Sequence, residues 1–202
     1  MSSPNSFMYR LHFATTNKGK IASLQRDLSG LDVELVPIEM DIPEIRADET
    51  PEIASRKVEY AFYHLKQPCI AQDGGFYIPV LNGFPKAYVN FAIGTIGIEG
   101  LLKLVEGKDR HCEFRDTLAF MDEGMKEPIL FTAVTRGTLA ESPRGELKPY
   151  HWGELHKVFI LEGQTKTFTE MTEAEMDRWR AGRYEDWCGR QFALWLKQNR
   201  LK

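Results

Sequence analysis

Long hydrophobic runs are missing from this sequence of 202 residues. No stretch reaches the roughly 18 consecutive apolar residues that a membrane-spanning helix requires. The first segment, Met1–Tyr9, is polar and lacks the apolar centre of a secretory signal peptide. These absences predict a cytoplasmic protein that has no membrane partner.

Cysteine is scarce, and the usual metal-binding spacings are absent. The three cysteines, Cys69, Cys112 and Cys188, are odd in number and far apart, with no Cys-x-x-Cys pair. The five histidines include no His-x-x-x-His spacing, and the sequence has no Gly-x-Ser-x-Gly motif. The sequence therefore argues against a disulfide framework, a zinc site and a serine hydrolase, and it predicts reduced thiols.

The sequence also lacks an excess of positive charge. Its 26 Lys and Arg residues against 29 Asp and Glu residues give a formal net charge of −3, with both signs mixed along the chain. Nucleic acid is not an expected partner, because duplex binding needs a basic field. The 43% of hydrophobic and 27% of charged residues are typical of a soluble globular protein. The length predicts a single domain over 1–202, with a disordered tail at about 1–8.

A polar run is predicted to connect the first strand to the first helix. Alternation predicts a strand at Arg10–Ala14, and Ile21, Leu24 and Leu28 recur at helical spacing. Hydroxyl, amide and ammonium groups at the positive end of a helix suit the binding of phosphates. The run is not the Gly-x-x-x-x-Gly-Lys-Ser/Thr loop, so an ordinary polar helix start is the alternative. The residues of the run are Thr15, Thr16, Asn17, Lys18, Gly19 and Lys20.

Two acidic residues are predicted to lie in turns. Glu44 follows a proline, and Asp73 comes after the short strand Cys69–Ala71 and before paired glycines, where we expect a tight turn. One or two carboxylates together with substrate phosphates are the ligands that Mg²⁺ takes in many enzymes. Lys57, on the helix predicted between the two acids, would neutralise phosphate charge. Solvated turn acids and a surface lysine are the alternative interpretation.

The remaining segments predict a mixed sheet with flanking helices. We expect helices from Asp48 to Leu65, at Ile98–Val105, and over Thr172–Leu196 with a break near Gly182. Proline and glycine predict a turn at Asn82–Pro85. Further strands are expected at Val33–Ile38, Phe114–Met121, Ile129–Ala140 and Val158–Leu161.

Six short segments follow one another along the chain and together span most of it, although each one alone is a weak signal. The segments are Phe13–Lys20, Asp41–Glu44, Glu52–Lys57, Ala71–Phe76, Leu81–Pro85 and Thr167–Met171. Taken in this order, they resemble the inosine triphosphate pyrophosphatase family, whose members remove deaminated purine nucleoside triphosphates.

The resemblance implies an elongated, two-lobed α/β fold, with a mixed, strongly twisted β-sheet flanked by helices, a central nucleotide cleft, and a homodimer. It implies a Mg²⁺-dependent hydrolase that cleaves a nucleoside triphosphate, such as ITP or XTP or a deoxy form, to monophosphate and pyrophosphate. Asp73 and Lys57 would be catalytic, and Glu44 and Asp73 would hold the metal. The substrate-binding residues would be Thr15, Thr16, Asn17, Lys18, Lys20, Gly74, Trp152 and Arg190.

The sequence departs from the family where the base is recognised. The Asp-Pro that relatives carry is absent from His151–Lys157, and their Ser-His-Arg is replaced by Cys188-Gly189-Arg190. Trp152 is expected to stack on the base and Arg190 to contact its edge, although tryptophan more often packs in cores or interfaces. The preferred base therefore stays open.

Two alternative functions also stay open. A non-catalytic nucleotide-binding protein is favoured by Asn90, which stands where relatives carry a catalytic-side lysine. Retention of Glu44, Lys57 and Asp73 together favours an enzyme. A phosphatase of another phosphorylated metabolite is the second alternative, and it would release orthophosphate.

Overall fold

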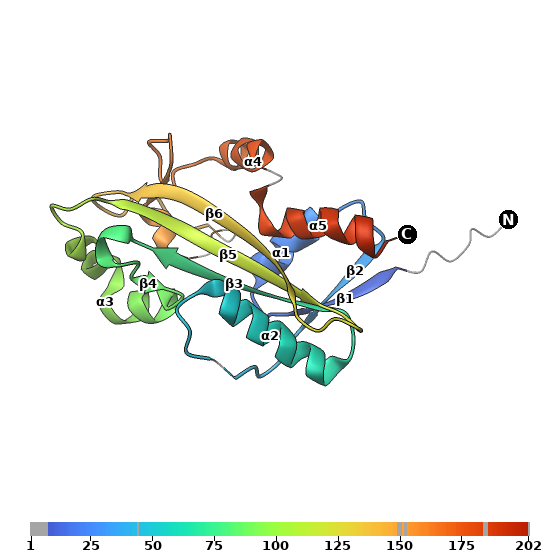
Figure 1. Ribbon diagram of the computed structural model, residues 1–202. Helices are drawn as coiled ribbons and strands as arrows, with labels where there is room; N and C mark the ends of the chain where they lie inside the picture. Colours follow the sequence, from blue (N-terminus) through green and yellow to red (C-terminus); the bar gives the residue numbers. More distant parts are fainter. Residues whose placement is uncertain (1–7, 44, 149–150, 152, 184–185, 202) are drawn as a thin grey trace.

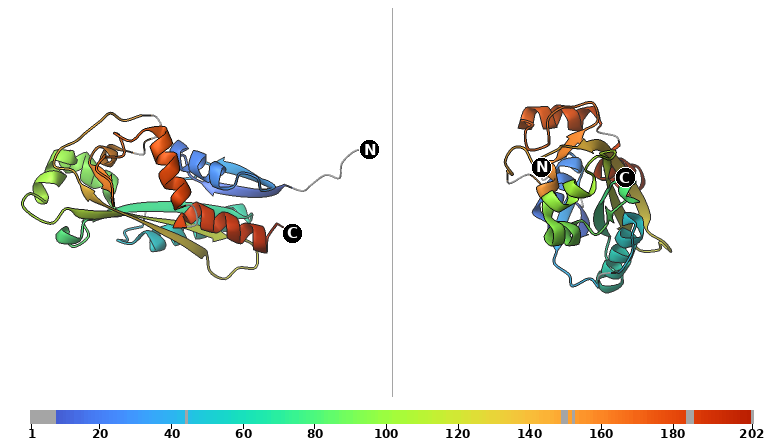
Figure 2. Two further views of the ribbon diagram at one scale, coloured as in Figure 1. Left: turned by 90° about the horizontal axis from the view of Figure 1, so that it is seen from above. Right: turned by 90° about the vertical axis from the view of Figure 1, so that its left-hand side faces the viewer.

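The computed structural model describes residues 8–43, 45–148, 151, 153–183 and 186–201. The molecule is elongated and built on one long, twisted sheet with helices on both faces (Figure 1). The N-terminal strands and the C-terminal helix lie together at one end, as the view from above shows (Figure 2). The predicted elongated α/β fold is confirmed. Of the predicted disordered tail, only Met8 lies within the described residues.

The sheet contains seven strands in the order β2-β1-β3-β5-β6-β7, with β4 paired to one end of β3. β1 runs parallel to β2 and β3, whereas β3, β5, β6 and β7 pair in antiparallel fashion. The sheet is mixed, as predicted. The strands are β1 (Tyr9–Ala14), β2 (Val33–Ile38), β3 (Cys69–Tyr77), β4 (Pro85–Lys86), β5 (His111–Met121), β6 (Ile129–Leu139) and β7 (Phe159–Leu161).

The helices cover the two faces of the sheet unequally. α2 covers one face, and α1 and α5 cover the other (Figure 1). Alternation along β5 gives the reason: Ala119 packs on the α2 side, whereas Leu118 and Phe120 pack on the α5 side. The helices are α1 (Lys18–Asp27), α2 (Thr50–Leu65), α3 (Val89–Leu104), α4 (Glu173–Gly182) and α5 (Cys188–Asn199), with 3-10 turns η1 (Pro79–Leu81) and η2 (Glu154–Lys157).

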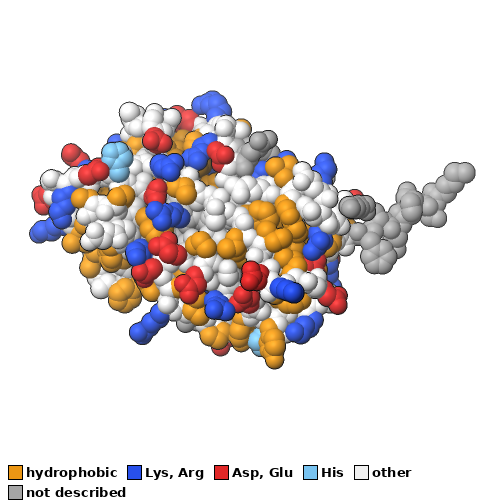
Figure 3. Space-filling model, in the orientation of Figure 1, with side chains coloured by type: hydrophobic (Ala, Val, Ile, Leu, Met, Phe, Trp, Pro, Cys, Tyr) orange, Lys and Arg blue, Asp and Glu red, His pale blue; other side chains and the backbone are white. Residues whose placement is uncertain are grey.

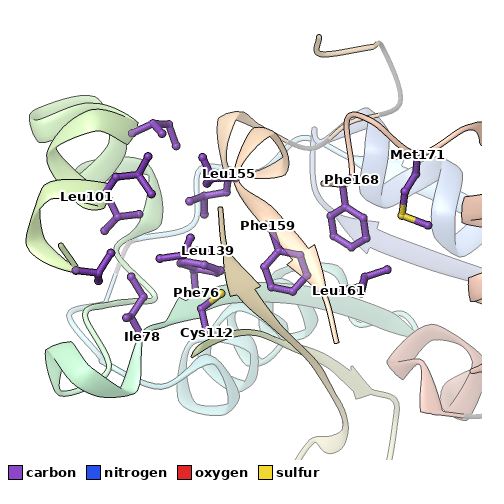
Figure 4. Packing of buried hydrophobic residues seen from close by; sticks show 14 of the residues in the cluster. Phe76, Ile78, Leu101, Cys112, Leu139, Leu155, Phe159, Leu161, Phe168 and Met171 are labelled. Carbon is purple, nitrogen blue, oxygen red and sulfur yellow. The ribbon is translucent and has the colours of Figure 1, made fainter. Parts of the chain in front are cut away.

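The α5 side of the sheet carries two separate hydrophobic cores. One lies between β1, α1 and α5 and includes Leu24, Phe120 and Phe192. The other lies at the opposite end and includes Phe159 and Phe168, whose ring centroids are 5.1 Å apart (Figure 4). Two cores on one sheet give the molecule its two lobes. The space where they meet holds the candidate site.

The surface of the face shown in Figure 3 carries Lys and Arg side chains intermixed with Asp and Glu. This distribution agrees with the formal net charge of −3 and the mixed signs of the sequence. No helix within the described residues has the length and apolar character needed to cross a membrane.

The tight turn predicted after Ala71 is wrong, because β3 continues unbroken from Cys69 to Tyr77. The glycines serve close approach instead of a turn. A Cβ on Gly74 would lie 2.8 Å from Oδ1 of Asp116, and one on Gly75 would lie 2.9 Å from the carbonyl oxygen of Lys86. A side chain at either position would force a neighbouring group to move, and at Gly75 that group is the backbone of Lys86. Asp73 therefore lies inside a strand and not at its end.

The helix predicted at Ile98–Val105 is longer in the structure, because α3 begins at Val89. Gly97, with φ of 67° and ψ of −178°, separates two helical stretches that form this element. The first stretch lacks a side-chain cap and its apolar spacing is weak, so the sequence pattern did not reveal it. The turn at Asn82–Pro85 is confirmed, with left-handed backbone at Asn82 and Gly83.

Gly137→Ala should destabilise the protein by about 1–3 kcal/mol, as expected for an extra methyl group in a packed interior. A Cβ at position 137 would overlap the carbonyl oxygen of Ile160 and lie 2.6 Å from Cζ of Phe159. Urea denaturation gives the free energy of unfolding. Gly94→Ala is the control, since its Cβ meets nothing within 4 Å and alanine favours a helix. Equal stability of the two variants would contradict the expectation.

Candidate active site

A gap in strand pairing exposes one edge of β3 at the centre of the sheet. β1 pairs with β3 only through His12 with Cys69 and Phe13 with Ile70. β4 pairs with β3 only at Phe76 and Tyr77. Among the described residues, no strand pairs with this edge of β3 between those two contacts, while β5 pairs with the other edge throughout. Asp73 and Gly74 lie in the gap.

The predicted phosphate-binding run lies beside this gap, between β1 and α1. The side chain of Asn17 caps α1 by accepting a hydrogen bond from the backbone N–H of Lys20 at 3.0 Å. Oγ1 of Thr15 accepts a hydrogen bond from the backbone N–H of Asn17 at 3.2 Å. The predicted turn from strand to helix is confirmed, and it provides a helix N-terminus of the kind that binds anions.

Lys20 links the start of α1 to the open edge of β3. Its Nζ donates a hydrogen bond to the carbonyl oxygen of Gln72 at 2.9 Å. Burial lowers the pKa of Lys20, while the carboxylates of Asp73 and Asp116 act in the opposite direction. A partly desolvated ammonium group therefore lies in the gap next to two carboxylates.

Lys57 approaches Asp73 from the opposite side of the sheet. The Nζ of Lys57 lies 2.5 Å from Oδ1 of Asp73, and the Asp73 side chain is only 12% exposed. The start of α2 is fixed by a hydrogen bond of 3.0 Å between the hydroxyls of Thr50 and Thr117. Thr117 is the partner of Asp73 across the β3–β5 pair. The packing of α2 therefore determines where the Lys57–Asp73 pair lies.

Asp116 is a candidate site residue that the sequence reasoning missed. It lies opposite Gly74 in the β3–β5 pair, next to Thr117, so its side chain projects to the face opposite to that of Asp73. Burial raises the pKa of Asp116 to about 6, and Lys20 opposes this increase. The sequence did contain a signal for Asp116, because this acid lies among the apolar residues of the predicted strand at 114–121. Buried aspartate is rare, so an acid in such a strand indicates a functional role.

A cavity of about 260 Å³ lies over Asp116, where the two cores meet. Its walls come from the sheet, α1, η2, α4 and the segment before α5, and they combine aromatic rings with polar and charged side chains. Burial lowers the pKa of His156 to about 3, which keeps this wall residue neutral. The lining residues are Ser23, Arg26, Asp27, Phe114, Asp116, Thr135, His151, His156, Phe168, Met176, Asp177, Trp179, Arg180, Ala181, Arg183 and Trp187.

The structure brings together only part of the predicted site. Lys20, Lys57, Asp73 and Gly74 lie around the gap in β3. Thr16 and Lys18 belong to the adjoining loop and the start of α1. Glu44 and Trp152 lie outside the described residues.

Two further expectations concern the base. Arg190 is not among the residues that line the cavity; its Nη1 donates a hydrogen bond of 3.3 Å to the carbonyl oxygen of Asp27. Of the other tryptophans, Trp179 and Trp187 line the cavity, whereas Trp195 packs against Phe120 in the core. Base contacts by Trp152 and Arg190 stay predictions.

Comparison with solved structures agrees with this fold. A HAM1 protein from Coxiella burnetii superposes with a TM-score of 0.80 at 23% identity, covering 95% of this chain and 100% of the other. The Ham1 protein of Staphylococcus aureus gives a TM-score of 0.76 at 21% identity, again covering 95% of this chain and 100% of the other.

Sequence comparison gives higher identities. A dITP/XTP pyrophosphatase from Methanopyrus kandleri is 36% identical over 188 residues, which cover 93% of this chain and 96% of the relative. A dITP/XTP pyrophosphatase from Thermococcus kodakarensis is 35% identical over 192 residues, covering 94% and 98%. The model of the Ham1 family matches residues 11–181. The chain therefore belongs to the Ham1 family.

Proposed function

We propose that this protein hydrolyses a deaminated purine nucleoside triphosphate, in its ribose or deoxyribose form, to the monophosphate and pyrophosphate. The observation that carries the proposal is the convergence of Lys20, Lys57 and Asp73 at the open edge of β3, beside the N-terminus of α1. The full-length similarity to relatives named dITP/XTP pyrophosphatases supports the same reaction.

The phosphates would lie between the start of α1 and the edge of β3. Backbone N–H groups at a helix N-terminus and two ammonium groups offer charge and hydrogen bonds to phosphate oxygens. Lys20 reaches this space from α1 and Lys57 from α2, so the two cations approach from different sides of β3. Thr15, Thr16 and Asn17 from the loop and Lys18 from the start of α1 would complete the cradle.

The residues present fit a magnesium ion that is held partly by the substrate. Within the described residues no group of three or more His, Cys, Asp and Glu side chains could hold a metal. Mg²⁺ needs no such cage, because it keeps waters and binds through one or two carboxylates and phosphate oxygens. Asp73, and Glu44, which precedes α2 in the sequence, would be its protein ligands. When bound, the ion would neutralise phosphate charge and polarise the phosphoryl group.

Asp73 would act on the attacking water. Its Oδ1 is held by Lys57 at 2.5 Å, which fixes the carboxylate and leaves its second oxygen to orient a water molecule and accept a proton. The water attacks the α phosphorus, and the bond to the bridging oxygen of pyrophosphate breaks. Lys20 and Lys57 would stabilise the negative charge that develops on the phosphates.

Asp73→Asn should reduce kcat by roughly 10²- to 10⁴-fold, because the general base is lost. Release of inosine monophosphate and pyrophosphate from ITP gives the rate. The control is Asp48→Asn, which removes an exposed carboxylate paired with Lys86 at 2.6 Å and should leave kcat unchanged. A wild-type kcat in Asp73→Asn would remove Asp73 from this role, and release of orthophosphate by the wild type would indicate a different phosphatase.

Lys20→Gln should lower kcat/KM by roughly 10²- to 10³-fold, because a donor to the developing charge is removed from a partly buried site. The control is Lys103→Gln on the exposed face of α3. Steady-state kinetics with ITP at a fixed Mg²⁺ concentration measure both variants. A loss of less than threefold in Lys20→Gln would show that this ammonium group does not serve the phosphates.

Removal of divalent ions should abolish turnover, and Mg²⁺ should restore it. Pyrophosphate release from ITP is measured after dialysis against EDTA and again after addition of MgCl₂. Circular dichroism of the metal-free protein shows whether the fold persists. Full activity in EDTA would contradict a role for the ion, and tight ITP binding without turnover in Mg²⁺ would indicate a non-catalytic nucleotide-binding protein.

A further inference from the structure

Asp116 provides a buried carboxylate at the floor of the cavity between the two cores. It is 6% exposed and lines the cavity together with aromatic rings from other elements. Among the described residues, the Asp116 side chain takes part in no hydrogen bond and no ion pair. Within the described residues, the Asp116 carboxylate therefore keeps its acceptor capacity for a ligand in the cavity.

The neighbouring strand is adapted to this carboxylate. A Cβ on Gly74 would lie 2.8 Å from Oδ1 of Asp116, so the absence of a side chain at position 74 makes room for the acid. The second buried acid of the cavity, Asp27, is positioned differently. Its carboxylate lies against Gly189 in the first turn of α5, where a Cβ would overlap Oδ2. Asp27 thus lies beside the N-terminus of α5, where the helix dipole favours negative charge.

The walls of the cavity suit a flat aromatic ligand. Phe114, Phe168, Trp179 and Trp187 line it, and base stacking on aromatic side chains is a general mode of nucleotide binding. Three arginines also line the cavity, and two of them are paired: Arg180 with Asp177 at 3.1 Å, and Arg183 with the carbonyl oxygen of Val134 at 3.0 Å. Arg26 is exposed. The most deeply buried polar side chains that line the cavity are Thr135, at 4% exposed, and Asp116, at 6% exposed. Of these two, the ionised Asp116 only accepts hydrogen bonds.

The cavity adjoins the phosphate side of the site. α1 carries Lys20 near its start, and Ser23 from the next turn lines the cavity. The Nζ of Lys20 binds the carbonyl oxygen of Gln72, two residues before Gly74, which is the partner of Asp116 across the β3–β5 pair. A nucleotide whose phosphates lie at Lys20 would have its base over Asp116.

We propose that Asp116 is the residue that selects the base, by accepting a hydrogen bond from a ring N–H group that 6-oxopurines carry and adenine lacks. This inference rests on the proposed function. Hypoxanthine carries a proton on N1, whereas adenine has a lone pair at that position. A buried carboxylate repels that lone pair, and an unsatisfied pair of acceptors is costly in a desolvated site.

The test compares ITP with ATP in Asp116→Asn, through the ratio of their kcat/KM values. The two substrates carry the same triphosphate, so any effect of the variant on Lys20 cancels in this ratio. An amide can also donate a hydrogen bond, and asparagine pairs well with adenine. We expect the preference for ITP over ATP to fall by roughly ten- to a hundredfold, the range for a hydrogen bond to a charged group.

Two further variants make the experiment specific. Asp116→Thr also removes the charged acceptor and suits a β-strand, so it replaces Asp116→Asn if that variant melts at a much lower temperature. Asp177→Asn removes one negative charge from the exposed rim of the same cavity. It should change the ratio by less than threefold. Assays at pH 8 keep Asp116 ionised, since its pKa is raised only to about 6.

The outcomes separate this inference from the proposed function. Absence of pyrophosphate release from every triphosphate by the wild type would remove the proposed function itself. If the wild type turns over ITP but Asp116→Asn slows ITP and ATP equally, Asp116 acts only through Lys20 and the inference fails. An equal change of the ratio in Asp177→Asn would assign selectivity to the net charge of the cavity and would also overturn it.

Discussion

Two aspartates on adjacent strands project to opposite faces of the sheet, and Lys20 stabilises the negative charge of both. Asp73 faces α2 and pairs with Lys57, while Asp116 faces the cavity, and Lys20 at the edge of β3 acts on the pKa of Asp116. Carboxylates that are this deeply buried stay ionised only where cations or hydrogen bonds compensate for the lost solvation. This compensation depends in turn on the positions of α1 and α2 relative to the open edge of β3, because these helices carry Lys20 and Lys57.

The sheet separates two chemical tasks by its alternation. Thr117 of β5 faces α2 and lies opposite Asp73, near the proposed phosphate chemistry, whereas neighbouring residues that face the other way belong to the two cores or lie between them. Along that second face, Phe114 belongs to one core and Leu118 to the other, with Asp116 between them. Asp116 is the polar residue among these three, and it thus marks the boundary between the two lobes. The cavity forms at this boundary because neither core fills the space.

Two glycines of β3 allow other groups to approach the strand closely. A side chain at position 74 would meet the Asp116 carboxylate, and one at position 75 would meet the backbone of β4. The extended conformation of β3 is therefore combined with close approach of other groups, for which glycine is the only residue small enough. The same logic applies at Gly189, which leaves room for the carboxylate of Asp27 beside the start of α5.

The sequence by itself determined the helix-start signals, the apolar alternation of the long strands, and the polar run at 15–20, because these depend on neighbouring residues alone. It also carried six ordered segments that identify the family. Paired glycines at 74 and 75 misled the local reasoning, since glycine permits a turn and also permits close packing. Only the tertiary structure decided between the two, because the atoms that exclude a side chain there come from β5 and from Lys86. It also decided that Asp116 and Lys20, far apart in the chain, act on one another, since their proximity depends on how β3, β5 and α1 pack.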